Sequence, residues 1–218
     1  MMNPPITFFT SSFDALPPGL AEDLYRLRHD TFSTRLNWKV DVTNGLEFDC
    51  FDQTQAVYML GIARERLVCA ARFLDIQAGT SMIADVFSDY FGGVSLPANA
   101  RCYDVSRLFI DKVRRNDCGL CGLPVTKMLF ISMINYCLRT GYDGMYAVVS
   151  RGMYVIFIRS GWKIQVIREG RSEKGEEIYL IYMPASELTR QDIVLKNWNS
   201  SFALFPCLDS GGGLSVVA

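Results

Sequence analysis

The chain has 218 residues, of which 50% are hydrophobic and 21% are charged, as expected for a globular protein with one core rather than for a disordered chain. Its formal net charge of −1 argues against a nucleic-acid-binding protein, because neutralising phosphates requires an excess of basic residues. A single histidine, His29, leaves little room for Ser-His-Asp or Cys-His catalysis or for a zinc site that uses histidine.

The hydrophobic pattern gives no reason to expect membrane association. The apolar run without charge over residues 128–138 is too short to cross a bilayer. The N-terminal segment contains neither a positively charged leader nor an apolar run of signal-peptide length. The seven cysteines are scattered and mostly lie in apolar segments, where a free thiol behaves as a small hydrophobic group. A reducing cytoplasm is therefore the predicted location.

In the N-terminal half, the spacing of apolar residues predicts one helix and then strands. Pro17 and Pro18 can open a helix in which Leu20, Leu24 and Leu27 fall on one face. Strand-like runs follow over residues 57–64, 67–76 and 103–110. A charged break typical of a hairpin separates the first two runs.

The C-terminal half alternates between strands and helices. Pro124 and Gly141 bracket an apolar helix over 125–140, and Ser150 can cap a helix that stops at Gly161. The remaining elements are strands over 146–149, 163–168 and 178–183 and a last helix over 187–198. This order predicts a single-domain α/β fold, a three-layer sandwich with a mixed central sheet over residues 1–205, and a flexible tail over 206–218.

The densest pattern of charged and aromatic residues lies in one stretch before the predicted hairpin. It consists, with fixed spacings, of Leu27, Arg28, Phe32, Arg35, Trp38, Val40, Glu47, Asp49, Phe51 and Asp52. This pattern is the signature of the LuxI-type autoinducer synthases, and the chain resembles that family from about residue 24 to 184. Further matching segments are 68–73, 106–112, 148–151 and 159–162.

The resemblance implies a fold similar to that of the N-acetyltransferases (GNAT-like) and the activity of an acyl-homoserine lactone synthase. Such an enzyme transfers an acyl chain from an acyl-acyl carrier protein to the amine of S-adenosylmethionine. The substrate's carboxylate then closes the lactone and expels methylthioadenosine, giving a quorum-sensing signal. S-adenosylmethionine is a substrate here, and the resemblance implies neither a cofactor nor a metal.

By resemblance, seven residues line the S-adenosylmethionine side of the cleft: Arg28, Phe32, Trp38, Asp49, Asp52, Arg72 and Arg107. Their chemistry suits this ligand, because aromatic faces can meet a sulfonium or an adenine and arginine forks can bind a carboxylate. The acidic residues could hold the ammonium or pair with the arginines. The alternative is that the set is a buried ion-pair network beside a core tryptophan.

The catalytic candidates are Asp104, Ser106 and Arg107. The family usually carries glutamate at the place of Asp104, so the carboxylate here is retracted by about 1.5 Å, the length of one C–C bond. Asp104 is the candidate base for the attacking amine. Alternatively, it is an ion-pair partner of Arg72 or Arg107.

The acyl chain needs an apolar tunnel. The candidate residues for it are Leu108, Phe109, Met128, Ala147, Val149, Ser150 and Met153. Each of them could equally belong to the ordinary hydrophobic core. Family members that make 3-oxo products commonly have threonine at the place of Ala147, where a hydroxyl can meet the oxo group. Alanine cannot donate a hydrogen bond, which favours an unsubstituted acyl chain.

The carrier protein is acidic, so a basic docking surface is expected, with the candidates Lys112, Arg114, Arg115, Lys127, Arg151 and Arg159.

Two other functions stay open. A coenzyme A-dependent N-acyltransferase usually has an Arg-x-x-Gly-x-Gly/Ala loop, which the loop 114–122 does not match. A non-catalytic ligand-binding relative could keep the motif with an altered Asp104. Cys118 and Cys121 form a C-x-x-C, but no second pair supports a zinc site.

Overall fold

The computed structural model describes residues 5–97 and 101–198. The strands of the main sheet are β1 (Thr7–Ser12), β4 (Ala56–Ala63), β5 (Arg66–Asp75), β6 (Cys102–Ile110), β7 (Gly144–Ser150), β8 (Gln165–Arg171) and β9 (Glu177–Pro184), and a small hairpin pairs β2 (Val42–Thr43) with β3 (Leu46–Glu47). The α-helices are α1 (Pro18–Arg28), α2 (Lys112–Asp117), α3 (Val125–Thr140), α4 (Arg151–Ser160) and α5 (Glu187–Asn197).

The main sheet is mixed, in the order β1-β4-β5-β6-β7-β9-β8. The predicted hairpin is confirmed as β4 and β5, and its turn residues Arg64 and Glu65 both have positive φ, 47° and 61°. This is the conformation of a type I′ turn, whose twist matches that of the two strands. β6 and β7 form the parallel pair, and every other pair of neighbouring strands in the sheet is antiparallel.

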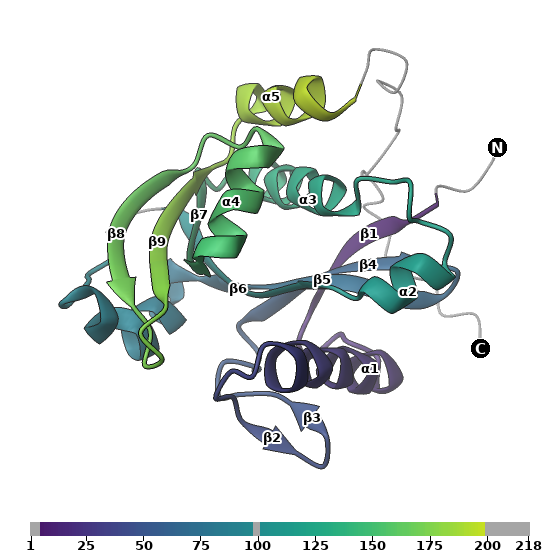
Figure 1. Ribbon diagram of the computed structural model, residues 1–218, viewed down its shortest axis with the longest axis horizontal. Coiled ribbons are helices and arrows are strands. Elements are labelled where there is room, and N and C mark those ends of the chain that lie inside the picture. The colour runs from purple at the N-terminus through teal and green to yellow at the C-terminus, as the bar shows by residue number, and fades with distance from the viewer. Residues whose placement is uncertain (1–4, 98–100, 199–218) are drawn as a thin grey trace.

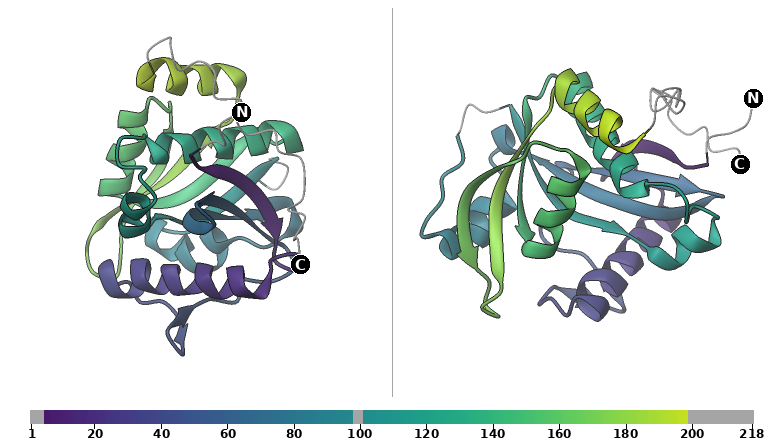
Figure 2. Two further views of the ribbon diagram at one scale, coloured as in Figure 1. Left: turned by 90° about the vertical axis from the view of Figure 1, so that its right-hand side faces the viewer. Right: turned by 45° about the horizontal axis from the view of Figure 1, so that its top comes forward.

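Helices cover both faces of the sheet, as expected for a three-layer sandwich (Figures 1 and 2). α1 lies on one face, and α3 with α4 and α5 lies on the other. α3 has the predicted bounds because Pro124 precedes it and Gly141 ends it in the left-handed conformation. The Ser150 side chain caps α4, accepting a hydrogen bond from the Met153 amide at 3.3 Å.

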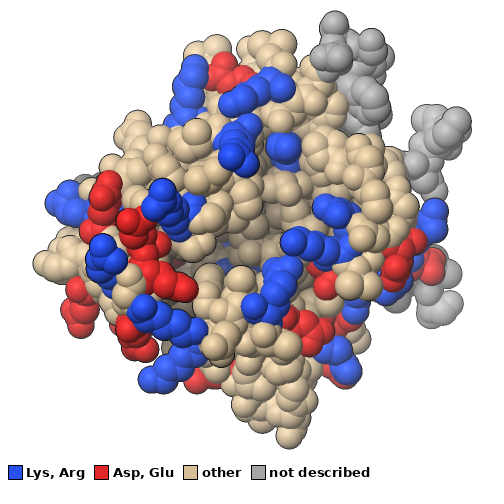
Figure 3. Space-filling view, viewed as in Figure 1, with Lys and Arg blue, Asp and Glu red and all other residues tan. Residues whose placement is uncertain are grey.

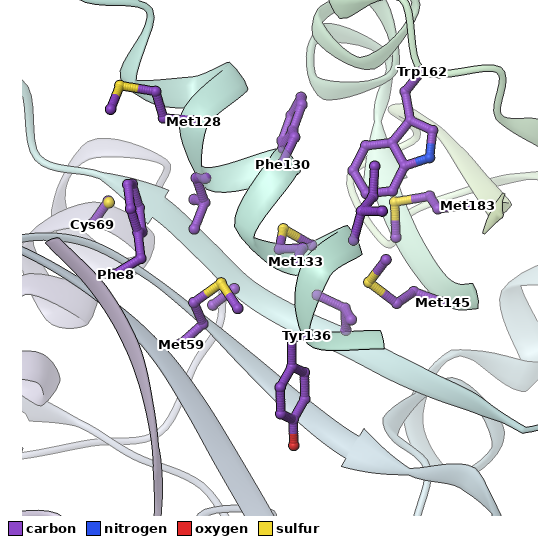
Figure 4. Packing of buried hydrophobic residues seen from close by; sticks show 14 of the residues in the cluster. Phe8, Met59, Cys69, Met128, Phe130, Met133, Tyr136, Met145, Trp162 and Met183 are labelled. Carbon is purple, nitrogen blue, oxygen red and sulfur yellow. The ribbon is translucent and has the colours of Figure 1, made fainter. Parts of the chain in front are cut away.

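Each face of the sheet has its own hydrophobic core. On the α3 face, residues such as Met133, Phe130 and Trp162 are buried almost completely, as Figure 4 shows. On the α1 face, Leu24 and Leu27 pack against the other side of β4 and β5. β5 is buried on both faces, which explains why its sequence is apolar without alternation.

Several elements were not predicted. They are β1, the β2–β3 hairpin, α2, the π-helices over His29–Arg35 and Ile83–Phe87, and two short 3₁₀ turns. The expected strand 163–168 begins two residues later, at Gln165. Within the described residues, no helix has the length and apolarity to cross a membrane. The predicted tail, 206–218, lies outside the described residues.

Candidate active site

The sheet opens between its two parallel strands. β6 and β7 pair only from Cys102 to Asp104 and from Gly144 to Tyr146. Beyond these residues β6 stays with β5, whereas β7 stays with β9, so the two strands separate. Figure 1 shows β7 and β9 leaving the plane of β6, and Figure 3 shows this side of the molecule hollowed near its middle. Asp104 is the last residue of β6 before the opening.

The charged residues of the 27–52 motif meet those of β5 and β6 in a closed ring of ion pairs on the α1 side of the sheet. Its six members alternate in charge, in the order Arg28, Glu47, Arg107, Asp49, Arg72, Asp52 and back to Arg28. The six contacts measure 2.5, 2.9, 2.7, 2.5, 2.9 and 2.8 Å between nitrogen and oxygen. Three positive and three negative charges cancel, which makes burial of the ring tolerable.

The ring is rigid because most of its hydrogen-bonding capacity is used. Asp52 accepts two hydrogen bonds from Arg28 at 2.8 Å, one from the Tyr58 hydroxyl at 2.8 Å and one from the Asp49 amide at 2.9 Å. These contacts hold the pKa of Asp52 well below its usual range although burial opposes this. Arg107 and Asp49 are the most exposed members, each with 8% of its side chain accessible, so they form the open side of the ring.

An aromatic wall stands beside the ring. Phe32, buried in the π-helix that continues α1, stacks on Trp38 with ring centroids 5.3 Å apart. The Arg107 guanidinium lies 5.6 Å from the centroid of the Phe32 ring. Trp38 is 40% exposed, so it is not a core tryptophan and has a face available to a ligand.

A β-bulge brings Arg107 to this side of the sheet. The register of β5 with β6 shifts between Ala70 and Arg72, so that Arg107 and Leu108 stand opposite a single residue of β5. Arg107 has a φ of 53°, which costs a non-glycine residue about 1 kcal/mol. Simple alternation would point Arg107 to the α3 face. The bulge instead places it on the same face as Asp104.

Asp104 has one occupied and one available carboxylate oxygen. Its Oδ2 accepts hydrogen bonds from the Ser81 hydroxyl at 2.8 Å and from the Ile83 amide at 2.9 Å. Among the described residues, none donates a hydrogen bond of normal geometry to Oδ1, and Asp104 forms no ion pair with Arg72 or Arg107. Burial raises the pKa of Asp104 to about 6, while the Ile83 amide, the Ser81 hydroxyl, the charge of Arg72 and the Met82 amide act in the opposite direction.

Ser106, the third catalytic candidate, accepts a hydrogen bond from Arg72 Nε at 3.1 Å and so joins the ring to β6. Two groups of residues around Asp104 and the ring were missed by sequence reasoning. Glu47 belongs to the motif but was given no role, although it is fully buried in the ring. The segment 81–83 carries no recognisable pattern, yet the Met82 sulfur lies 3.4 Å from Arg72 Nη2.

The acyl-pocket candidates separate into two groups. Five of them lie in or against the core on the α3 face: Leu108, Met128, Ala147, Val149 and Met153. Ser150 follows Val149 at the end of β7 and caps α4. Phe109 belongs to the core on the α1 face, where its ring forms a T-shaped pair with Phe32, with the ring centroids 6.3 Å apart. Leu108 and Phe109 are adjacent in β6 and therefore point to opposite faces, and the bulge decides that Leu108 faces α3.

The basic candidates lie on α2, α3 and α4, which border the hollow in Figure 3. Arg114 is engaged by Asp23 through two hydrogen bonds of 2.5 and 2.6 Å. Arg151 is 72% exposed and pairs with Glu177 at 3.0 Å. Neither Cys118 nor Cys121 is in a disulfide, and the described residues contain no cluster of metal ligands.

The fold is that of the N-acetyltransferase-like acyltransferases. The structure resembles a Lactobacillus plantarum protein assigned as an N-acetyltransferase, with a TM-score of 0.56, 13% identity and coverage of 83% of this chain and 99% of that one. It also resembles the CoA-dependent acyl-homoserine lactone synthase BjaI, solved with SAM and isopentyl-CoA, with a TM-score of 0.73, 19% identity and coverage of 88% and 89%. The expected GNAT-like fold is thus confirmed.

The sequence comparisons identify the family. The family model "Autoinducer synthase" matches residues 17–193. The acyl-homoserine-lactone synthase of Serratia liquefaciens is 39% identical over 191 residues, which cover 88% of this chain and 95% of that protein. That of Enterobacter agglomerans is 42% identical over 179 residues, 82% of each chain. The chain belongs to the autoinducer synthase family and is an acyl-homoserine-lactone synthase, an acyltransferase.

Proposed function

We propose that Asp104 is the base that takes the proton of the attacking amine of S-adenosylmethionine. The observation that carries this proposal is its position, at the point where β6 and β7 separate, with Oδ2 engaged by the protein and Oδ1 available. With a pKa of about 6, the carboxylate is charged at neutral pH and still basic enough to accept a proton, directly or through a water. The neutral amine then attacks the thioester carbon, and the thiolate leaves.

The second step needs orientation rather than a base. The substrate's carboxylate displaces methylthioadenosine from its own γ-carbon and closes the lactone. We assign binding of S-adenosylmethionine to the open side of the ring, where Arg107 and Asp49 are least buried and Trp38 offers an aromatic face. Three more deeply buried members of the ring, Arg28, Asp52 and Arg72, hold Arg107 and Asp49 in place.

Release of methylthioadenosine tests the assignment of Asp104. Incubation of the Asp104→Asn enzyme with S-adenosylmethionine and an acyl donor is expected to give no methylthioadenosine, while S-adenosylmethionine still binds. Near-normal turnover of this variant would remove Asp104 from the mechanism. A released thiol without methylthioadenosine in the wild type would instead indicate a plain N-acyltransferase.

For the acyl chain we propose the α3 side of the opening, lined by Leu108, Met128, Val149 and Met153 near Ala147. Ala147 is 5% exposed and faces this core from β7, so no hydroxyl is available there for a 3-oxo group. The expected product therefore carries an unsubstituted chain. Mass spectrometry of the lactones made by cells that express the enzyme tests this expectation. A dominant 3-oxo lactone would contradict it.

We propose acyl-acyl carrier protein as the donor, taken from the cytoplasm. The support is the group of basic residues on α2, α3 and α4 beside the opening and the absence, in the loop 114–122, of the glycine spacing that usually binds a pyrophosphate. BjaI is described as CoA-dependent, so acyl-CoA is the specific alternative. Turnover with equal concentrations of the two donors distinguishes them. Equal or faster turnover with acyl-CoA would overturn the assignment.

A further inference from the structure

We infer that Ser81 is a positioning residue, one that holds the Asp104 carboxylate so that only Oδ1 faces the opening of the sheet. The inference rests on the proposed role of Asp104. Ser81 lies outside the motif and outside β5 and β6, and it is 7% exposed. Its hydroxyl is the one side-chain donor to Asp104 among the described residues.

The direction of the Ser81 hydroxyl is fixed by its own environment. Its oxygen accepts a hydrogen bond from the Ala84 amide at 3.3 Å, at the start of the π-helix Ile83–Phe87. With that lone pair engaged, the hydroxyl proton points to Asp104 Oδ2, where it joins the Ile83 amide. Two donors on one oxygen fix the rotation of the carboxyl group, because turning it would break both bonds.

The same segment also contacts the ring of ion pairs. Met82 lies between the two donors to Asp104, and its sulfur is 3.4 Å from Arg72 Nη2 and 3.7 Å from Arg107 Nη1. Residues 81–83 therefore set the distance between the base and the ring that we assign to S-adenosylmethionine.

Replacing Ser81 by alanine should move the titration of Asp104. Arg72 on β5 is the charged side chain that acts on Asp104, Tyr146 is its register partner on β7, and both stay in place. Loss of one hydrogen bond to the ionised form raises the pKa of the carboxyl group by about one pH unit. The acidic limb of the pH profile for methylthioadenosine release is expected to move upward by this amount. Ser81→Thr, which keeps the hydroxyl, should restore the wild-type profile.

Ser160→Ala is the matched control. Ser160 is also buried, and its hydroxyl donates to the Phe157 carbonyl at 2.6 Å and accepts from the Trp162 amide at 3.2 Å. The control variant thus loses the same number of hydrogen bonds, none of them to a carboxylate. Its acidic limb is expected to stay where the wild-type limb lies, even if its stability falls.

A second measurement separates the inference about Ser81 from the proposal about Asp104. The pH above which the difference in urea stability between Asp104→Asn and its parent stops growing reports the pKa of Asp104 in the folded protein without any catalysis. In the Ser81→Ala background this pH should lie about one unit higher. If neither this pH nor the acidic limb moves, the inference is wrong. If only this pH moves and Asp104→Asn still turns over, Ser81 positions Asp104 but Asp104 is not the base.

Discussion

Replacing Asp104 by asparagine is expected to make the protein more stable at neutral pH while it abolishes lactone synthesis. Asparagine has nearly the same shape as aspartate. Its side-chain oxygen can accept the hydrogen bonds from Ser81 and Ile83, which leaves the amide nitrogen toward the opening. What the substitution removes is the burial of a negative charge.

The size of the effect follows from the pKa of Asp104. Burial raises it from 3.8 to about 6, and each pKa unit corresponds to about 1.36 kcal/mol, so the difference amounts to about 3 kcal/mol. Below pH 4 the carboxyl group is protonated in both the folded and the unfolded chain and has no effect on stability. Between about pH 4 and pH 6 the unfolded chain releases the proton first, so the wild type loses stability as the pH rises. Asparagine has no such loss.

The assay is urea unfolding of the wild type and Asp104→Asn from pH 4 to pH 8. The difference in unfolding free energy is expected to grow by about 3 kcal/mol in favour of the variant and to level off above pH 6. Asp143→Asn is the control, because Asp143 is exposed and pairs with Arg101 at the surface. A difference for Asp104→Asn that does not change with pH would refute the argument that Asp104 is a buried, destabilising carboxylate.

Three further predictions concern other parts of the molecule. Glu47→Gln leaves the ring of ion pairs with one positive charge in excess and should lower the unfolding free energy by about 3 kcal/mol in urea titrations. An unchanged midpoint of urea unfolding would contradict the conclusion that Glu47 neutralises this ring. Trp38→Ala should weaken S-adenosylmethionine binding in calorimetry while unfolding changes by less than about 1 kcal/mol, since the side chain is 40% exposed; unchanged affinity would remove Trp38 from the site. Glu65→Gly relieves a positive φ in the β4–β5 turn and should raise the melting temperature by about 2–4 °C, whereas a lower value would show that the turn is not strained.

Much of the fold could be predicted from the sequence, because its signals are local. The helix 125–140 has its proline and glycine at the two ends, and the charged break before Leu67 marks the turn of the hairpin. The placement of β9 between β7 and β8 has no such signal. Strand order depends on pairing between distant segments, and single-strand patterns are the same for any partner.

For the proposed site, the resemblance to the family indicated the residues, and the tertiary structure decided how they are arranged. Arg28, Asp49 and Asp52 became candidates because their positions match the signature of the family, in which so many constrained positions rarely agree by chance. Their closure into a neutral ring required the bulge that turns Arg107 to the α1 side, a feature of the pairing between β5 and β6. Asp104 was recognisable as a departure from the family pattern. Its meaning depends on Ser81, which is distant in sequence and reaches Asp104 only in the folded chain.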